Sequence, residues 1–499
     1  MKLTGMLVLF LFVLNANAQS SYFNVKESQK YKDQFSAATV LSVNTSEDNH
    51  TIIARSSKAN LVFETFDDKV QGKKILNTTL ERKEVFEGEL FYDNKVMIFT
   101  VHSPSKIERI VNCHIYHIDT HTHEKVELFK TSVAKNGSLF SGQNKRQTNF
   151  AISPDKNFIA VATDNIKKTS NSYLIHVFDA KTLKLKYSKN YYSNPEKFFR
   201  SSDMKVDNQG NAYSIGKAYF KGKREKKEDK ANYSFVLSKI TEEDAVNTQQ
   251  IELHENEYIQ NLSMQINGNI LNLIGYYSEK NAYGIKGVSQ FKVSSKDLTV
   301  LDKKKSKLPI QVYEDIYGQN SAKDKKNREL TSFDLDHVLM DEEGNTFLVA
   351  EEFFITQTYV QNGFNTVGTY HIVYHYNDIL ITKFSPNGNL IWGRSIFKRS
   401  NRPSYSAFIQ DDKLHVLLNS GKDLATKQDG RLKVSKGWLE STALYDFVYD
   451  KEGNLTREKI QDNKGKPKYI PYRGNYVDGK FVMYNNSGNS KQLMMLESK

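Results

Sequence analysis

Histidine side chains gather in one short stretch of the chain. Between Cys113 and Glu124, four of the twelve histidines fall within ten residues, namely His114, His117, His121 and His123. Imidazoles two positions apart on one face of a strand can chelate zinc or copper. Aligning this stretch with residues 175–188 places residues 119–123 on a hairpin turn, where histidines face solvent. The sequence therefore predicts turn histidines here and no metal site.

A second group of candidate residues is aromatic. Residues 353–380 form an insertion in which tyrosines are interleaved with histidines, and Asn362-Gly363 can turn the insertion into a long β-hairpin. Exposed tyrosines bring a large contact area at small entropic cost, as in protein- and glycan-binding patches. The alternative is an ordinary long hairpin whose rings pack on neighbouring structure. The residues that we predict to bind a protein or glycan partner are Tyr359, Phe364, Tyr370, His371, Tyr374, His375 and Tyr376.

Recurring turns show what must position these side chains. Gly-Asn turns occur at residues 207–211, 265–269, 341–345, 386–389 and 450–454, each between two short apolar runs. Glycine or asparagine with positive φ closes a β-hairpin at such a point. Two hairpins in succession give four antiparallel strands per repeat, which is the pattern of a β-propeller blade. The sequence thus predicts an all-β propeller.

The number of blades depends on how the ring closes. Seven complete repeats run from about residue 37 to residue 463, and residues 469–499 offer only three further strands. The N-terminal run that begins at Tyr22 can supply the missing outer strand and so remove a free sheet edge. We expect eight four-stranded blades with a ring closed by the N- and C-terminal strands; seven blades is the alternative.

A propeller also offers a hub at which an enzyme could assemble its site. Titratable residues in or near the strands are His102, His176, His254, His337, His415, Asp203, Asp334 and Asp336. Close carboxylates among them would suit a hydrolase or lyase that acts on carbohydrate or peptide at the central channel. However, no GxSxG, HExxH or P-loop motif occurs, and quinoprotein and Asp-box patterns are incomplete. The sequence therefore assigns no catalytic residue and no cofactor.

The N-terminus has the pattern of a secretory signal peptide. In residues 1–18, Lys2 precedes an apolar stretch, and Ala16-Asn17-Ala18 forms a small-residue cleavage site. No cysteine follows that site, so we expect an exported protein that is periplasmic or extracellular and not a lipoprotein. Residues 19–499 form a single propeller domain in this interpretation, without a transmembrane segment. The single cysteine, Cys113, excludes an intramolecular disulfide.

Charge gives little support for nucleic-acid binding. The formal net charge is +12, but 57 lysines stand against 13 arginines, and arginine is the residue that forks onto phosphates and base edges. Lysines on solvated strands keep sheet edges from pairing with other chains. Residues 221–230 and 303–329 carry runs of charge and are predicted to be charged loops. A helix at residues 321–329 would be polar all round.

One part of the chain resembles a known group of proteins. Residues 370–392 combine the YHYND hairpin with a Gly-Asn turn and Trp392. This pattern resembles exported bacterial proteins of similar length and unknown function, over residues 336–462. The resemblance implies a bacterial cell-envelope setting and no particular activity. Taken together, the sequence favours a non-catalytic binding or scaffolding propeller over the channel-centred hydrolase or lyase.

Overall fold

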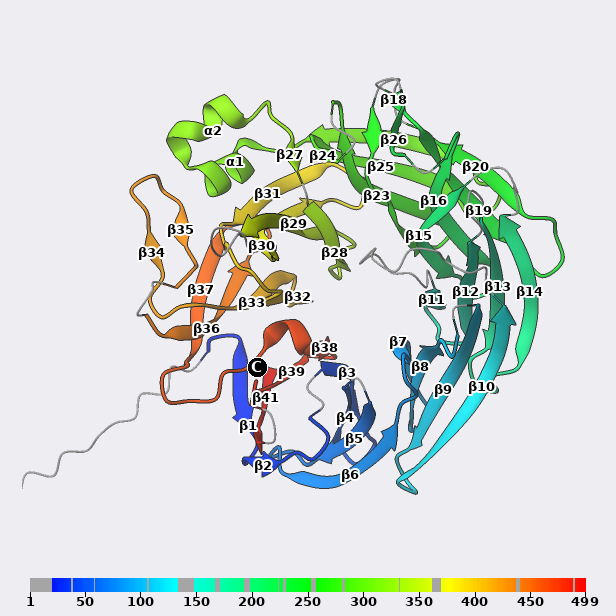
Figure 1. Ribbon diagram of the computed structural model, residues 1–499, viewed down its shortest axis with the longest axis horizontal. Coiled ribbons are helices and arrows are strands. Elements are labelled where there is room, and N and C mark those ends of the chain that lie inside the picture. The colour runs from blue at the N-terminus through cyan, green and yellow to red at the C-terminus, as the bar shows by residue number, and fades with distance from the viewer. Residues whose placement is uncertain are drawn as a thin grey trace, which may run out of the picture.

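The computed structural model describes residues 20–36, 39–57, 59–105, 107–132, 148–166, 171–192, 198–222, 224–227, 230–252, 257–280, 283–331, 333–360, 369–436, 440–487 and 490–499. Of these described residues, 62% are in strands and 4% in helices. Its strands form eight antiparallel four-stranded blades arranged in a ring (Figure 1). The predicted fold class and the preferred blade count are both confirmed.

The blades follow one another in chain order, and the strands of each blade are named from the channel outward. Blades 1 to 4 consist of β3 (Thr39–Thr45), β4 (Thr51–Ser56), β5 (Asn60–Phe66) and β6 (Gly72–Thr79); β7 (Val85–Tyr92), β8 (Lys95–His102), β9 (Glu108–His117) and β10 (Thr122–Ser132); β11 (Asn149–Ile152), β12 (Phe158–Ile166), β13 (Asn171–Asp179) and β14 (Leu185–Tyr192); and β15 (Phe199–Val206), β16 (Ala212–Tyr219), β19 (Tyr233–Ile240) and β20 (Asn247–Ile251).

Blades 5 to 8 continue in the same way. They consist of β22 (Ser263–Asn267), β23 (Ile270–Ser278), β25 (Gly287–Ser294) and β26 (Val300–Lys307), with β21 (Tyr258–Ile259) also paired to β23; β28 (Phe333–Met340), β29 (Thr346–Val360), β30 (Thr369–Phe384) and β31 (Leu390–Ile396); β32 (Tyr405–Gln410), β33 (Lys413–Gly421), β36 (Thr442–Tyr449) and β37 (Leu455–Asp462); and β38 (Asn475–Val477), β39 (Lys480–Tyr484), β41 (Leu493–Ser498) and β1 (Phe23–Glu27).

Short ladders lie in the connections between these strands. They pair β2 (Tyr31–Lys32) with β40 (Ser490–Lys491), β17 (Lys226–Lys227) with β18 (Lys230–Ala231), β24 (Gly284–Ile285) with β27 (Leu330–Thr331), and β34 (Ala425–Thr426) with β35 (Leu432–Lys433). The middle strands of the blades are almost wholly buried, and all eight residues of β16 are an example. Apolar clusters fill the spaces between adjacent blades, which accounts for the non-alternating apolar runs in the sequence.

The ring closes through the N-terminal strand, as the sequence predicts. Strand β1 pairs antiparallel with β41, from Phe23 opposite Ser498 to Glu27 opposite Met494. Figure 1 shows the two strands side by side, the first blue and the last red. Phe23 is fully buried among blade 7 and blade 8 side chains. The two ends of the chain therefore stabilise one blade together, and no free edge is left there.

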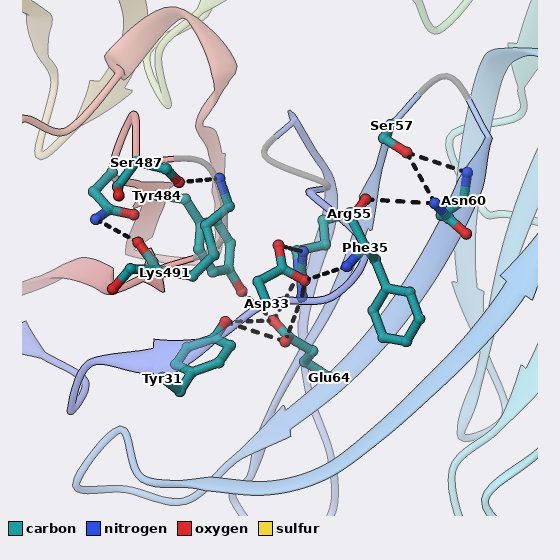
Figure 2. Close-up of polar contacts among 12 residues, drawn as sticks. Tyr31, Asp33, Phe35, Arg55, Ser57, Asn60, Glu64, Tyr484, Ser487 and Lys491 are labelled. Atoms are coloured by element: carbon teal, nitrogen blue, oxygen red, sulfur yellow. Dashed lines mark hydrogen bonds and ion pairs between the residues drawn. The ribbon is translucent and has the colours of Figure 1, made fainter.

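A buried charge network reinforces the seam between blades 8 and 1. The Arg55 guanidinium on β4 donates to Glu64 at 2.7 and 2.8 Å and to Asp33 at 2.9 Å. The hydroxyls of Tyr31 and of Tyr484 on β39 donate to the same Glu64 carboxylate, at 3.1 and 2.5 Å (Figure 2). The side chains of Arg55 and Asp33 are inaccessible to solvent. We refer to these five residues as the seam cluster.

The alternation of strands gives the ring two different faces. We call the four strands of a blade A to D, from the channel outward. The turns that join A to B and C to D lie at one end of the blades, which we call the turn face. The predicted Gly-Asn turns are there: Gly210, Gly268, Gly344, Gly388 and Gly453 all have positive φ, between +55° and +82°. The B–C loops and the connections between blades lie at the opposite end, the loop face. The loop face carries the long insertions.

One prediction about the charged segments is wrong. Residues 303–329 are not a loop: residues 303–307 belong to β26, and two helices follow, α1 (Ile310–Tyr317) and α2 (Gln319–Lys325). Helix α1 is amphipathic, and it buries Val312, Tyr313 and Ile316 against the edge of blade 6. The apolar residues of 310–317 were hidden by the flanking runs of lysine. No helix of the described residues is long and apolar enough to cross a membrane.

Candidate functional site

The predicted aromatic hairpin is present and extends beyond its blade. Strands β29 and β30 have 15 and 16 residues, and their pairing reaches Val360 opposite Thr369. The neighbouring strand β31 ends at Ile396, opposite Ile379, so the outer part of the hairpin stands free of it. The base is fixed by two backbone hydrogen bonds between Tyr376 and Ser400, of 2.8 and 3.1 Å.

The predicted binding residues of the hairpin do not form a single patch. Phe364 lies outside the described residues, as do the side chains of Tyr359, Tyr370 and His371. Tyr374 and Tyr376 lie on one face of the hairpin with Phe353, whose ring is 6.5 and 4.9 Å from theirs. His375 lies on the other face, stacked on Phe354 at 4.4 Å. Cross-strand pairing requires this division, because neighbouring residues of a strand point to opposite faces.

The face that carries Phe354 and His375 forms one wall of a cavity. This cavity has a volume of about 940 Å³ and lies on the loop face across blades 6, 7 and 8. Its other walls are the connection between β31 and β32, the B–C loop of blade 7, and the connection between β37 and β38. We call it the loop-face groove. It is larger than the two other cavities near the seam, of about 670 and 490 Å³.

The loop-face groove is strongly cationic. Its described lining contains no aspartate or glutamate. The cations that line it are Lys398, Arg399, Arg402, Lys436, Lys468 and Arg473. Desolvation, together with the nearby charges of Lys436 and Arg402, lowers the pKa of the Lys468 ammonium. The positive charges are thus close enough to repel one another.

Only two of the six cations are neutralised by carboxylates behind the groove wall. The buried Lys398 ammonium forms an ion pair with Glu351 and donates to Ser404 at 3.0 Å. Arg399 lies 3.2 Å from a carboxylate oxygen of Asp378. Among the described residues, Arg402, Lys436, Lys468 and Arg473 have no carboxylate within ion-pair distance. The groove therefore has a surplus of about four positive charges.

The carboxylates behind the wall sit in an environment that disfavours their charge. The pKa of Asp378 is raised to about 7, chiefly because the carboxyl is buried; the Arg399 charge opposes this shift and the Glu352 charge adds to it. Burial also raises the pKa of Glu351 and of Asp336. Asp336 accepts a hydrogen bond of 2.6 Å from Tyr405. These carboxylates lie behind the groove wall, where Glu351 and Asp378 contact the lining residues Lys398 and Arg399, and they are not themselves part of its described lining.

The hub residues do not converge on one site. Asp203, Asp334, Asp336 and His337 lie on innermost strands, but Asp203 accepts a backbone hydrogen bond from Met264 at 2.8 Å. Burial and the neighbouring Asp336 raise the pKa of Asp334. The other predicted hub histidines that are described, His102, His176 and His415, lie on second or third strands. His176 contacts Ser188 and Phe129 of outermost strands, and His415 pairs with Asp446 at 2.8 Å. His254 lies outside the described residues.

The histidine-rich segment on blade 2 is only partly a solvent-exposed turn. His114 is fully buried, with its Nε2 3.0 Å from Glu84 and its Nδ1 3.1 Å from His123 Nε2. Burial and the adjacent His114 lower the pKa of His123 to about 4. Cross-strand pairing of β9 with β10 brings these two histidines together, which an alignment of turns does not reveal. Within the described part of the chain, no three His, Cys, Asp or Glu side chains are grouped to hold a metal ion.

Sequence reasoning missed the cations of the groove. The connection from residue 464 to residue 473 holds four cations and no carboxylate, which was a usable signal. Its meaning depends on which loops lie beside it. Arg402 and Lys436 come from two other connections, and only the ring places the three segments around one cavity.

Comparison with known proteins assigns no family to this chain. No protein-family model matches the chain, and no curated protein matches it in sequence. Among solved structures it is similar to the polysaccharide lyase Uly1, with a TM-score of 0.40 and 11% identity over 82% of this chain and 89% of that one. It is also similar to the Dos1 propeller, with a TM-score of 0.41 and 8% identity over 95% of both chains. Prolyl oligopeptidase B from Galerina marginata matches with a TM-score of 0.39 and 9% identity, over 92% of this chain and 54% of that one.

Proposed function

We propose that this protein is an exported, non-catalytic binding propeller that engages a protein or glycan partner through the loop face of blades 6 to 8. One observation carries the proposal. The extended hairpin and the loops of blades 7 and 8 line the same cavity of about 940 Å³. A cavity of this size and position suits a ligand of several residues.

The hairpin gives this surface a second contact area. On the face directed away from the groove, Ile355 and Tyr374 are 48% and 49% exposed. They are direct cross-strand neighbours, so their side chains form a single apolar patch at the edge of the binding surface. Burying such a patch against a partner removes apolar area from water, which is the usual source of binding energy at an aromatic anchor.

The hairpin can be tested by deletion. Replacing residues 356–374 with a short Asn-Gly turn should leave the eight blades folded, because those residues lie beyond the end of β31. Binding to arrays of defined oligosaccharides and peptides should weaken at least about tenfold for every ligand that the intact protein retains. Circular dichroism and the melting temperature serve as controls. Unfolding of the variant would show that the hairpin is part of the core, and unchanged binding would remove it from the site.

A second candidate function is a hydrolase or lyase at the central channel. It is favoured by one observation, namely that Asp334 and Asp336 lie two residues apart on the innermost strand β28 and both have a raised pKa. Such a pair can divide the roles of acid and base. The test is turnover of oligosaccharides and peptides by the intact protein and by Asp334→Asn. Product formation that this substitution abolishes would favour the enzyme over the binding module.

A further inference from the structure

The charge of the loop-face groove is unusual for this protein. Many lysines at the surface lie beside a carboxylate, as Lys130 does with Glu108 and Lys451 with Glu343. In the groove, by contrast, Arg402, Lys436, Lys468 and Arg473 approach one cavity from three connections, and no described carboxylate lines it. Like charges held close together raise the free energy of the folded state. An anion bound between them would relieve that repulsion.

We propose that the groove binds an acidic oligosaccharide, in which carboxylate or sulfate groups occur on successive sugar units. This inference rests on the proposed binding function and names the class of its ligand. The anionic groups would lie against Arg402, Lys436 and Lys468. Arg473 lines both this groove and the adjoining cavity of about 670 Å³ between blades 1 and 2. The lining of that cavity also includes Arg82, Lys83 and one carboxylate, Glu84, so a longer acidic chain would meet two further cations there.

The uncharged part of the lining favours a sugar over a peptide. Amide and hydroxyl side chains such as Asn401, Ser435 and Asn486 surround the cations, and they can exchange hydrogen bonds with sugar hydroxyls. Tyr472 is 39% exposed at the rim, and His375 offers a second ring in the opposite wall. Flat rings of this kind suit the apolar faces of sugars.

The cations themselves set the expected salt dependence. Arg402, Lys436 and Lys468 are solvent-exposed, so dissolved ions screen their attraction for a ligand. At about 0.1 M salt the screening length is about 10 Å, and at 1 M it is about 3 Å. Binding of an acidic sugar should therefore weaken steeply as salt is added. Binding of a neutral sugar through the aromatic rim should change little.

The test uses the intact protein and calorimetric titration with matched pairs of hexasaccharides. One member of each pair is an oligogalacturonate, an oligomannuronate or a chondroitin sulfate, and the other is its carboxyl-reduced or desulfated counterpart. We expect at least one acidic member to bind at least tenfold more tightly than its neutral counterpart. The triple variant Arg402→Gln/Lys436→Gln/Lys468→Gln should weaken that binding at least tenfold and leave the melting temperature unchanged.

Matched controls make each outcome decisive. The triple variant Lys184→Gln/Lys303→Gln/Lys307→Gln removes the same charge from exposed positions on or beside outer strands of blades 3 and 5, and it should bind within twofold of the intact protein. Equal binding of acidic and neutral members would overturn the acidic-ligand inference and leave the proposed binding function standing. Tighter binding of a glutamate hexapeptide than of every acidic sugar would replace the sugar by a peptide. If the intact protein retained no ligand on the oligosaccharide and peptide arrays, both proposals would be contradicted.

Discussion

The seam cluster and the loop-face groove use the same kind of side chain in opposite ways. At the seam, one arginine meets two carboxylates, and the side chains of Arg55 and Asp33 are inaccessible to solvent. In the groove, four cations meet none among the described residues, and three of them are exposed. Burying a charged side chain away from water costs several kcal/mol unless the charge is paired, so the buried charges of the seam must have partners of opposite sign. The groove faces water and can keep its charge for a ligand.

The largest expected effect comes from removing the closing strand. Deleting residues 19–30 takes away β1, its five-residue pairing with β41 and the buried ring of Phe23. Loss of one buried phenylalanine costs about 3–5 kcal/mol, and each lost hydrogen bond adds about 1 kcal/mol. We expect the variant to unfold at a much lower denaturant concentration. An unchanged melting temperature would mean that the ring does not depend on this strand.

The next largest effect should come from breaking the seam cluster. Substituting Arg55→Met leaves Glu64 and Asp33 buried without their cation, which should lower the free energy of unfolding by about 3–5 kcal/mol. Denaturant titration measures this directly. Lys451→Gln is the matched control, since its pair with Glu343 is exposed and an exposed ion pair contributes little to stability. Equal effects of the two substitutions would show that burial does not distinguish the two regions.

Asp378 lies between the two extremes, because it is buried but only partly neutralised. Its pKa is raised to about 7, so the folded protein holds a proton that the unfolded chain releases near pH 4. Stability should therefore fall as the pH rises from about 4 to about 7 and then stay level. Asp378→Asn should remove at least about 2 kcal/mol of this fall, given about 1.4 kcal/mol per pKa unit. Urea titrations of both proteins at pH 5 and pH 8 would measure this difference. The same change in the free energy of unfolding between the two pH values in both proteins would contradict the prediction.

The smallest effect on stability is expected in the groove. The triple variant Arg402→Gln/Lys436→Gln/Lys468→Gln removes exposed charges that lack described carboxylate partners, so the free energy of unfolding should change by less than about 0.5 kcal/mol. We expect this small change to be an increase in the free energy of unfolding. The substitutions remove the partly desolvated ammonium of Lys468 and its repulsion by Lys436 and Arg402, which together lower the pKa of Lys468. A loss comparable to that of Arg55→Met would show that these cations are structural, as at the seam.

The difference between the two regions also explains which parts were predictable. The closing strand was predicted from the sequence by counting, because seven full repeats and three C-terminal strands leave one outer strand to be supplied; the charge cluster at the seam was not predicted. The hairpin was predicted from its aromatic content, but its division into two faces was not, although the alternation of 353, 355, 374 and 376 follows from strand geometry. Helix α1 was missed because three buried side chains stand between lysine runs.

Local pattern by itself determined the repeat, the turns and the closing strand, because positive-φ glycines and short apolar runs act on neighbouring residues. Tertiary structure decided which loops share a cavity and which charges meet. Glu64 and Asp33 reach Arg55, while no described carboxylate reaches Arg402 or Lys468. A side chain's charge is fixed by its type, but its energy depends on the distance to other charges and to water. Those distances arise only when blades that are remote in sequence close into a ring.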